Sequence, residues 1–548
     1  PDVVTNAMSS PSSRLWAIVV DDLHLIEQDV VAIKKTLTDI VLALAPDDEV
    51  ALVYIGRSDL SRNFKTDLAG LMEAIGNVRA ALGFGLDAYP QAGNPPAYIL
   101  AQAARTSDTL RNVAMTMAGS GHTRRAIIYV GTMATFPADE EPGISFITME
   151  LQRTFDQARR SNVPIYTIDP RGQVLPEEAV RGGIGKILNN SVRSRVVANL
   201  RNQRAWMGVL ALNTGGRAFT NNSDLTRAVH EIVGENGSFY ELAYSPTPLV
   251  ADGKFHDFEV KVDRPGVRVR ARTGYVAPGA NSAAAPLSVT AESAMSSGVD
   301  VLGLTLRALA TPIAPGEKGM QTAVTIEVTY PAPAGGSRRI ADTIAVSIYA
   351  LDPDARIKQA VSRQIRLDGQ AADDRDVTLV IDDLVDLPSE RLTLRMGVAS
   401  EQLGRAGTVQ MPIDVPKPTD GRLQLSGIAI GLAAPAPPAM NAKAIAAVVP
   451  FQPTTSRSFA RADTLRVFGR AFWRSRDPIV VTMGLKGVAS AFSQVALQPF
   501  PGVRGGQAAT FDAPLPLNQL APGAYVLEIT ARPKSGAPVT REMPFVVR

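Results

Sequence analysis

The stretch that decides the fold is "LWAIVVDDLHLIEQD", residues 15–29. Its apolar run "WAIVV" leads directly into two adjacent carboxylates, Asp21 and Asp22, and His24 follows. A continuous apolar run is typical of a strand buried on both faces of a parallel sheet. Because a buried carboxylate costs free energy unless it is paired, we expect a partner at the end of this strand. That partner is a metal ion, a set of backbone N–H groups or a nearby cation.

Residues 14–278 alternate buried-strand patterns with helical patterns. Further buried strands are predicted in "EVALVYIG", "RRAIIYVG" and "VPIYTIDP". Apolar stripes at helical spacing predict helices over 29–44, 67–82, 96–117, 146–162, 192–213 and 224–233. This alternation predicts a doubly wound, Rossmann-type parallel sheet with helices on both faces. Alternating apolar and polar residues over about 238–275 predict antiparallel strands that extend or flank this sheet.

The second half of the chain has a different pattern. After a Pro/Ala/Gly-rich linker at 279–286, residues 287–416 contain seven short strand patterns separated by polar turns. Residues 417–548 repeat this texture. We therefore predict a multidomain chain in which a short tail, 1–13, precedes the α/β domain and two all-β, Ig-like sandwiches follow it.

Composition excludes several classes of protein. The absence of cysteine removes disulfides, thiolate metal sites and cysteine nucleophiles. With 56 basic and 53 acidic residues the charge is nearly balanced, and no basic stripe favours nucleic acid as a partner. No apolar run is long enough to predict a transmembrane segment, and no signal peptide is seen at the start.

The first half resembles a von Willebrand factor A domain over about 14–278. The resemblance is carried by "AIVVDDLHL", "RRAIIYVG", "NVPIYTIDPRG", "ALNTGGRAF", "SFYELAYSPT" and "DGKFHDFEVKVDRPGVRVRARTGY". The last two are similar to the divergent version of this domain in bacterial secreted proteins. The resemblance implies a secreted, periplasmic or cell-surface protein with a metal-ion-dependent adhesion site at the carboxyl edge of the sheet. There an Asp-x-Ser-x-Ser motif, a Thr and a distal Asp hold Mg²⁺ or Ca²⁺, which prefer oxygen ligands.

This sequence departs from that ligand pattern. If Asp21 is the first ligand, Leu23 and Leu25 replace the serines, and if Asp22 is, the serines are replaced by His24 and Ile26. Where the family has Thr-Asp-Gly, this chain has Gly131-Thr132-Met133, and the loop 83–96 has no Thr. The resemblance therefore implies a degenerate site in which Asp21 and Asp22 are the metal-ligand candidates. Asp87 or Asp139 would have to replace a missing ligand.

Simpler interpretations exist for these and other residues. Asp21 and Asp22 precede a predicted helix, where carboxylates accept hydrogen bonds from backbone N–H groups. His24 is then a loop residue that forms hydrogen bonds. Asp169 precedes a proline, a pattern that predicts a turn. The other histidines, His122, His230 and His256, show no i,i+4 spacing. The segment "GGIGKI" at 182–187 lacks the spacing of a phosphate-binding loop. The G-x-S-x-G motif of α/β-hydrolases is absent from the sequence. We interpret Tyr240, Tyr244 and Tyr275 as packing residues.

These observations favour a non-enzymatic protein outside the cytoplasm, without a cofactor, that binds a protein partner. The predicted binding edge contains Asp21, Asp22, His24 and Thr132, with the loops 83–96 and 132–141. One alternative is a metal-dependent adhesin with a rebuilt Mg²⁺ or Ca²⁺ site. Another is a structural subunit that assembles with copies of itself in a surface or fibre assembly.

Overall fold

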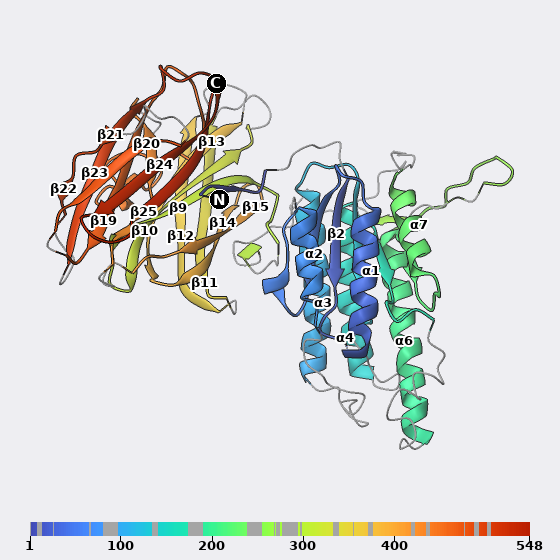
Figure 1. Cartoon of the computed structure of the whole chain (residues 1–548). Coiled ribbons are helices and arrows are strands. Elements are labelled where there is room, and N and C mark those ends of the chain that lie inside the picture. The colour runs from blue at the N-terminus through green and yellow to red at the C-terminus, as the bar shows by residue number, and fades with distance from the viewer. Residues whose placement is uncertain are drawn as a thin grey trace. The chain divides into compact units, whose positions relative to one another are not determined.

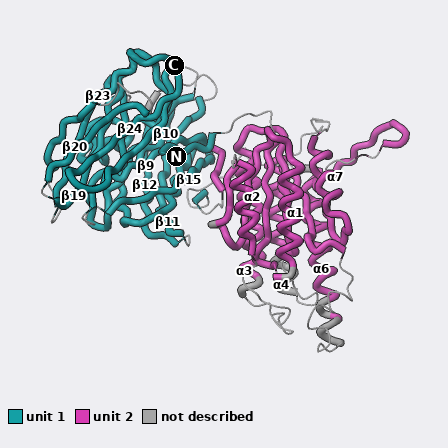
Figure 2. Tube along the Cα trace, in the orientation of Figure 1, with its two compact units in different colours: residues 1–7, 289–295, 304–548 teal, residues 8–288, 296–303 magenta. Residues whose placement is uncertain are grey.

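The protein is described by a computed structural model. It describes residues 2–7, 14–25, 27–64, 67–79, 97–133, 141–173, 190–237, 255–267, 269, 274–276, 294–295, 299–332, 339–353, 356–370, 376–417, 422–434, 439–475, 477–486, 493–500 and 506–548. The chain divides into two compact units (Figure 2). The α/β unit contains residues 8–288 and 296–303, and the β unit contains residues 1–7, 289–295 and 304–548.

The α/β unit is built on a five-stranded sheet in the order β3-β2-β4-β5-β6. Figure 1 shows β2 of this sheet with helices around it. Each neighbouring pair of strands in the sheet is parallel. The strands are β2 (Leu15–Val20), β3 (Glu49–Tyr54), β4 (Arg125–Val130), β5 (Ile165–Ile168) and β6 (Ala218–Phe219). β2 is buried along its whole length, as its continuous apolar run predicts.

Helices cover both faces of this sheet. Alternate residues of β2 point to opposite faces, so Ile18 joins one apolar core and Ala17 the other. The first core is closed by helices α1 (Val30–Ala43), α2 (Leu68–Gly76) and α7 (Leu225–Gly237). The second is closed by α3 (Ala97–Ala118), α4 (Glu141–Arg160) and α6 (Asn190–Thr214). The predicted parallel α/β sheet near the N-terminus is thus confirmed.

Two short strand pairings lie outside the five-stranded sheet. Beyond β3, Arg62 forms an isolated antiparallel bridge with Leu52. The short strands β7 (Phe255–Asp257) and β8 (Gly274–Val276) pair with each other as a separate two-stranded sheet. The strand predicted to continue after Asp257 is not formed over 258–263, where the side chains are mostly exposed and no apolar face is buried.

The first pair of sheets in the β unit is antiparallel. One sheet has the order β1-β9-β10-β13 and the other β12-β11-β14-β15, and the two sheets share one apolar core. The strands are β1 (Val4–Thr5), β9 (Thr305–Pro315), β10 (Gly319–Tyr330), β11 (Arg339–Leu351), β12 (Ile357–Gln370), β13 (Val377–Pro388), β14 (Arg391–Ser400) and β15 (Arg405–Asp414). The sequence predicted strands at β9–β15, but not the pairing of β1 with β9.

The second pair of sheets closes around another core. One contains β16 (Gln424–Leu425), β17 (Ala429–Leu432), β19 (Thr464–Trp473), β22 (Gln498–Pro499) and β23 (Gln507–Pro516). The other contains β18 (Ser458–Phe459), β20 (Ile479–Leu485), β21 (Ser493–Gln494), β24 (Gly523–Pro533) and β25 (Val539–Val547). All pairings are antiparallel except that of β18 with β25. Antiparallel sheets therefore follow the α/β sheet, as predicted.

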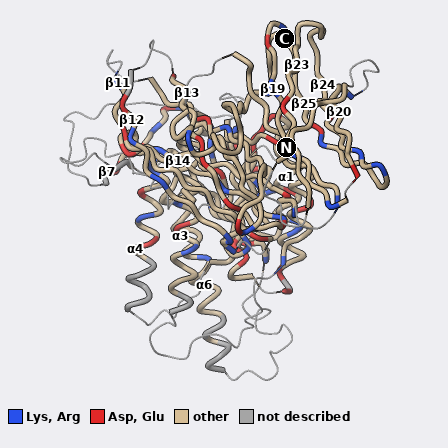
Figure 3. The backbone as a smooth tube through the Cα atoms, turned by 90° about the vertical axis from the view of Figure 1, so that its left-hand side faces the viewer, with Lys and Arg blue, Asp and Glu red and all other residues tan. Residues whose placement is uncertain are grey.

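Charged residues of both signs are interspersed along the described backbone (Figure 3). Among the helices of the described residues, none combines the length and apolar character needed to cross a bilayer.

Candidate functional site

The predicted site residues lie at the carboxyl edge of the parallel sheet, where the chain changes direction. From β2 the chain proceeds to β3 on one side, and it later returns to place β4 on the other. In open α/β sheets, ligands bind at the carboxyl ends of strands where the strand order reverses in this way. Val20, which ends β2, lies opposite Val130, which ends β4, so Asp21 and Thr132 emerge at this switch point.

Asp21 is completely buried and has polar partners on both carboxylate oxygens. His24 Nδ1 lies 2.8 Å from Oδ1 and 2.7 Å from Oδ2, and the Tyr129 hydroxyl donates a hydrogen bond to Oδ2. Burial alone raises the pKa of Asp21, but the charge and hydrogen bond of His24 and the Tyr129 hydrogen bond outweigh it. The pKa of Asp21 is lowered below its ordinary value, so this carboxylate stays ionised.

The close approach of β4 to Asp21 requires a glycine at position 131. A Cβ atom placed on Gly131 would lie 2.4 Å from the Cβ atom of Asp21. This is far below ordinary van der Waals contact. Asp21 therefore leaves no room for a side chain at position 131, which explains the glycine there.

Asp22 points in a different direction, towards the end of β3. Its Oδ1 accepts a hydrogen bond from the backbone N–H of Gly56 at 2.5 Å, and its Oδ2 accepts one from Arg57 at 2.7 Å. Burial raises the pKa of Asp22, and these two N–H groups offset only part of that rise. The Asp22 carboxylate thus caps the loop after β3 and does not share a ligand with Asp21.

His24 and Thr132 lie together above Asp21. The Thr132 hydroxyl donates a hydrogen bond of 3.2 Å to the backbone carbonyl of His24, which joins the loop after β2 to the loop after β4. Nδ1 of His24 faces Asp21, while its Nε2 is buried without a hydrogen-bond partner in the described part of the chain. The structure thus brings Asp21, His24 and Thr132 together.

The positions that would supply serine ligands are used for packing. Leu23 packs against the core closed by α3, α4 and α6. Leu25 is buried in the core closed by α1, α2 and α7. Because these side chains anchor the loop on both faces of the sheet, hydroxyl groups at the same positions would point into apolar surroundings and away from the edge.

A chain of polar contacts extends from Asp21 to helix α6. The Tyr129 hydroxyl also accepts a hydrogen bond from the backbone of Met133. The Met133 carbonyl accepts one of 3.2 Å from Gln203 Nε2, and Gln203 Oε1 accepts one of 3.0 Å from Arg171. Met133 has a φ of 62°, which is unfavourable for a bulky residue, so these contacts hold its backbone in a strained conformation.

Asp169 completes this network at the end of β5. It is fully buried, and Arg171 contacts both its oxygens, at 2.8 and 2.9 Å. Arg204 of α6 donates a further hydrogen bond of 3.2 Å to Oδ2 of Asp169. The backbone N–H of Arg171 also donates to Asp169 Oδ1, a turn contact of the kind expected before a proline.

These contacts determine what the edge can do chemically. Every carboxylate oxygen of Asp21 and Asp22 already accepts a hydrogen bond or contacts His24. No group of three or more His, Asp or Glu side chains that could hold a metal ion occurs among the described residues. The described residues therefore do not by themselves fit the Mg²⁺ site that the resemblance implies, because such an ion needs several accessible oxygen ligands.

Other predicted residues lie elsewhere. His122 lies at the opposite edge of the sheet, where its Nε2 is 3.4 Å from Glu49 Oε2. His230 lies in α7. His256 lies in β7, and Tyr275 lies in β8. Several sites and segments fall outside the described residues: Asp87, Asp139, Tyr240, Tyr244, loop 83–96, most of loop 132–141, 182–187 and linker 279–286.

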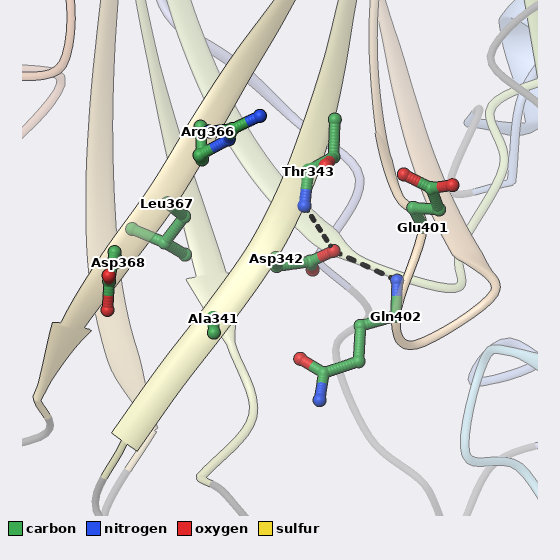
Figure 4. Close-up of a pocket in the computed structure, with 8 residues that line it drawn as sticks. All are labelled: Ala341, Asp342, Thr343, Arg366, Leu367, Asp368, Glu401 and Gln402. Carbon is green, nitrogen blue, oxygen red and sulfur yellow. Dashed lines mark hydrogen bonds between the residues drawn. The ribbon is translucent and has the colours of Figure 1, made fainter.

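The β unit contains a hollow beside the start of β11 and the end of β12 (Figure 4). Asp342, Asp368 and Glu401 line it. Asp342 accepts hydrogen bonds from the backbone of Thr343 at 2.7 Å and of Gln402 at 2.9 Å (Figure 4). Its other oxygen accepts hydrogen bonds from the hydroxyls of Tyr330 and Ser400. Both oxygens of the Asp342 carboxylate therefore already have hydrogen-bond partners within the protein.

Sequence reasoning missed Tyr129, Gln203 and the two arginines on Asp169. The signal for Tyr129 was a hydroxyl inside the otherwise apolar strand "AIIYV", since a buried tyrosine hydroxyl needs a partner. Gln203 and Arg204 had no such signal, because their roles depend on how α6 crosses the sheet. Comparison with protein-family models and with curated proteins finds no match to this chain.

Proposed function

We propose that the α/β unit is a divergent von Willebrand factor A-type domain that binds a protein partner at its carboxyl edge without a metal ion, and that it is not an enzyme. The strand order and the antiparallel bridge of Arg62 beyond β3 support this fold assignment. We further propose that the sheets of the β unit are Ig-like sandwiches that act as spacers outside the cytoplasm.

One observation carries the metal-independent mode of binding. His24 and Tyr129 take up the oxygens of Asp21 that would otherwise bind a cation. The imidazole of His24 and the hydroxyl of Tyr129 give the buried carboxylate the polar partners that an ion supplies in a metal-dependent site. The switch-point position favours recognition at this edge, and the hydrogen bonds through Gln203 connect the edge to α6.

A capture experiment tests the proposal on the intact chain. Wild-type protein, the Arg57→Glu variant and the Arg124→Glu variant are immobilised and exposed to an extract of the source cells and their medium, with and without EDTA. Both arginines are exposed, but Arg57 follows β3 at the carboxyl edge and Arg124 precedes β4 at the opposite edge. Arg124→Glu is therefore a matched charge-reversal control.

We expect mass spectrometry to find a protein that wild type and Arg124→Glu retain, that Arg57→Glu loses and that EDTA does not release. Retention by all three proteins, or by none, contradicts binding at this edge. Release by EDTA supports a metal-dependent adhesin instead. Hydrolytic turnover that Asp21→Ala abolishes contradicts a non-enzymatic role.

A further inference from the structure

The segment 439–455, called the strap, crosses the outer face of one sheet in the β unit. It connects β17 to β18, which belong to the second pair of sheets, but it is bound to β13 of the first pair. Met440 donates to the Val380 carbonyl at 2.7 Å and accepts from the Asp382 N–H at 3.0 Å. Asn441 Nδ2 donates to the Asp382 carbonyl at 3.0 Å. The strap is thus anchored around Asp382.

Apolar side chains of the strap contribute to a small core between the two pairs of sheets. The core joins strands β9 and β10 of the first pair to β17 and β19 of the second. The strap supplies Ile445, Val448 and Val449. Loosening the strap therefore weakens the junction between the two pairs of sheets.

Asp382 lies beneath this strap with only one of its oxygens satisfied. Its side chain is fully buried. Oδ1 accepts hydrogen bonds from the Thr325 hydroxyl at 2.7 Å and from Gln452 of the strap at 3.2 Å. Oδ2 is buried and has no hydrogen-bond partner among the residues that the structure describes. An ionised carboxylate with a bare oxygen is costly in such a place, whereas a neutral carboxyl group costs much less.

The charged groups near Asp382 do not neutralise it. Asp383, its neighbour on β13, points to the other side of the sheet and pairs with Arg363 at 2.6 Å. No salt bridge to Asp382 is found within the described residues. The remaining titratable and charged side chains on β9, β10, β13 and the strap are Arg307, Glu327, Tyr330, Asp386 and Lys443.

We propose that Asp382 makes the strap a pH-sensitive latch, which is tight while Asp382 is protonated and loosens when Asp382 ionises. The strap contributes to the burial of Asp382, so water can solvate the bare Oδ2 of the carboxylate when the strap lifts. In the closed state, burial raises the pKa of Asp382 to about 6, and the charge of Asp383 adds to that rise.

The direction of the effect follows from linkage. Lifting the strap would expose Asp382 to water and bring its pKa back towards the ordinary value of 3.8, whereas with the strap closed the value is about 6. The closed state is therefore favoured most below pH 3.8, loses stability as pH rises towards 6, and changes little above that pH. Over this interval the opening equilibrium changes up to about tenfold for each pH unit.

Hydrogen exchange of the intact chain tests the latch. Protection factors of strap peptides are measured between pH 4 and pH 7.5 (roughly the interval set by linkage) after correction for intrinsic exchange. We expect protection of the strap to fall by up to about 100-fold from the acidic to the neutral end, while peptides of β2 and β4 stay protected. Strap protection that does not change with pH contradicts the latch.

Two variants make the test specific. Asp382→Asn removes the titrating group, so strap protection should become independent of pH. Thr325→Val removes a hydrogen bond that favours the charged form, so the upper end of the transition should move to higher pH. Asp414→Asn, which alters a largely exposed carboxylate of the same unit, should behave as wild type. A wild-type pH profile in Asp382→Asn overturns the proposal, and an unmoved transition in Thr325→Val does so even if Asp382→Asn fails to fold.

Discussion

The Tyr129 hydroxyl donates a hydrogen bond to Oδ2 of Asp21, and these two residues are 108 positions apart in the sequence. The contact joins β4 to the end of β2 at the switch point of the sheet. Burial and the nearby Asp21 charge raise the pKa of Tyr129 well above its ordinary value, so the hydroxyl remains a donor. The stability of this edge therefore depends on a proton that Tyr129 keeps.

Tyr129→Phe should destabilise the protein, because it removes a donor from a buried charged acceptor. We expect a loss of about 1.5–3 kcal/mol in the free energy of unfolding, measured by urea denaturation. Tyr54→Phe is the matched control, since the Tyr54 hydroxyl donates to a neutral carbonyl, that of Ala74, at 3.1 Å. Its loss should be smaller, about 0.5–1.5 kcal/mol. Equal losses would show that the Asp21 charge does not strengthen the Tyr129 contact.

His24→Ala should be more damaging, because it leaves the fully buried Asp21 carboxylate without the imidazole that contacts both its oxygens. Breaking a buried pair on one side costs about 3–5 kcal/mol. Adding Asp21→Asn removes the unpaired charge, so the double variant should recover much of the lost stability. A double-mutant cycle by urea denaturation measures this coupling, and strictly additive losses would mean that His24 and Asp21 act independently.

Gly131→Ala should destabilise the edge, because the new methyl group would overlap the side chain of Asp21. We expect a loss of about 1–3 kcal/mol in thermal or urea unfolding. Gly208→Ala in α6 is the control, since a Cβ there meets no atom within 4 Å. It should stabilise the helix by about 1 kcal/mol. A neutral Gly131→Ala would show that β4 does not approach Asp21 as closely as described.

The raised pKa of Asp382 also predicts a pH dependence of global unfolding. The folded-state pKa is about 6 and the ordinary value is 3.8, so its contribution is fully present below pH 3.8 and is lost as pH rises to about 6. Urea denaturation of wild type and Asp382→Asn at a series of pH values isolates this contribution as the difference between the two curves. A difference that is constant with pH would mean that Asp382 does not titrate in this range.

Much of the fold follows from local pattern. The run "WAIVV" predicts β2 because a strand covered on both faces has no polar position, and the seven strand patterns after the linker predict β9–β15. The pairs Asp21–Asp22 and Asp382–Asp383 are harder to interpret from the sequence. Asp382 and Asp383 lie inside β13, where adjacent carboxylates disfavour a strand, because their partners Thr325 and Arg363 come from other strands.

The candidate site was predictable only in part. His24 is close to Asp21 in sequence, and its pairing is a local property of the loop after β2. Tyr129 reaches Asp21 only because β4 aligns with β2 so that Val19 lies opposite Tyr129. That register is set by packing on both faces of the sheet, which no short motif encodes. The same holds for Gln203, which contacts the edge through the position of α6.

Isothermal titration calorimetry with Mg²⁺, Ca²⁺ and Mn²⁺ tests the central claim most directly, that His24 and Tyr129 occupy the place of an ion at Asp21. Wild type and Asp21→Asn are titrated side by side at millimolar metal, and thermal unfolding is followed under the same conditions. The account predicts no saturable heat and no change in unfolding temperature for either protein. Saturable heat for wild type that disappears in Asp21→Asn would contradict it.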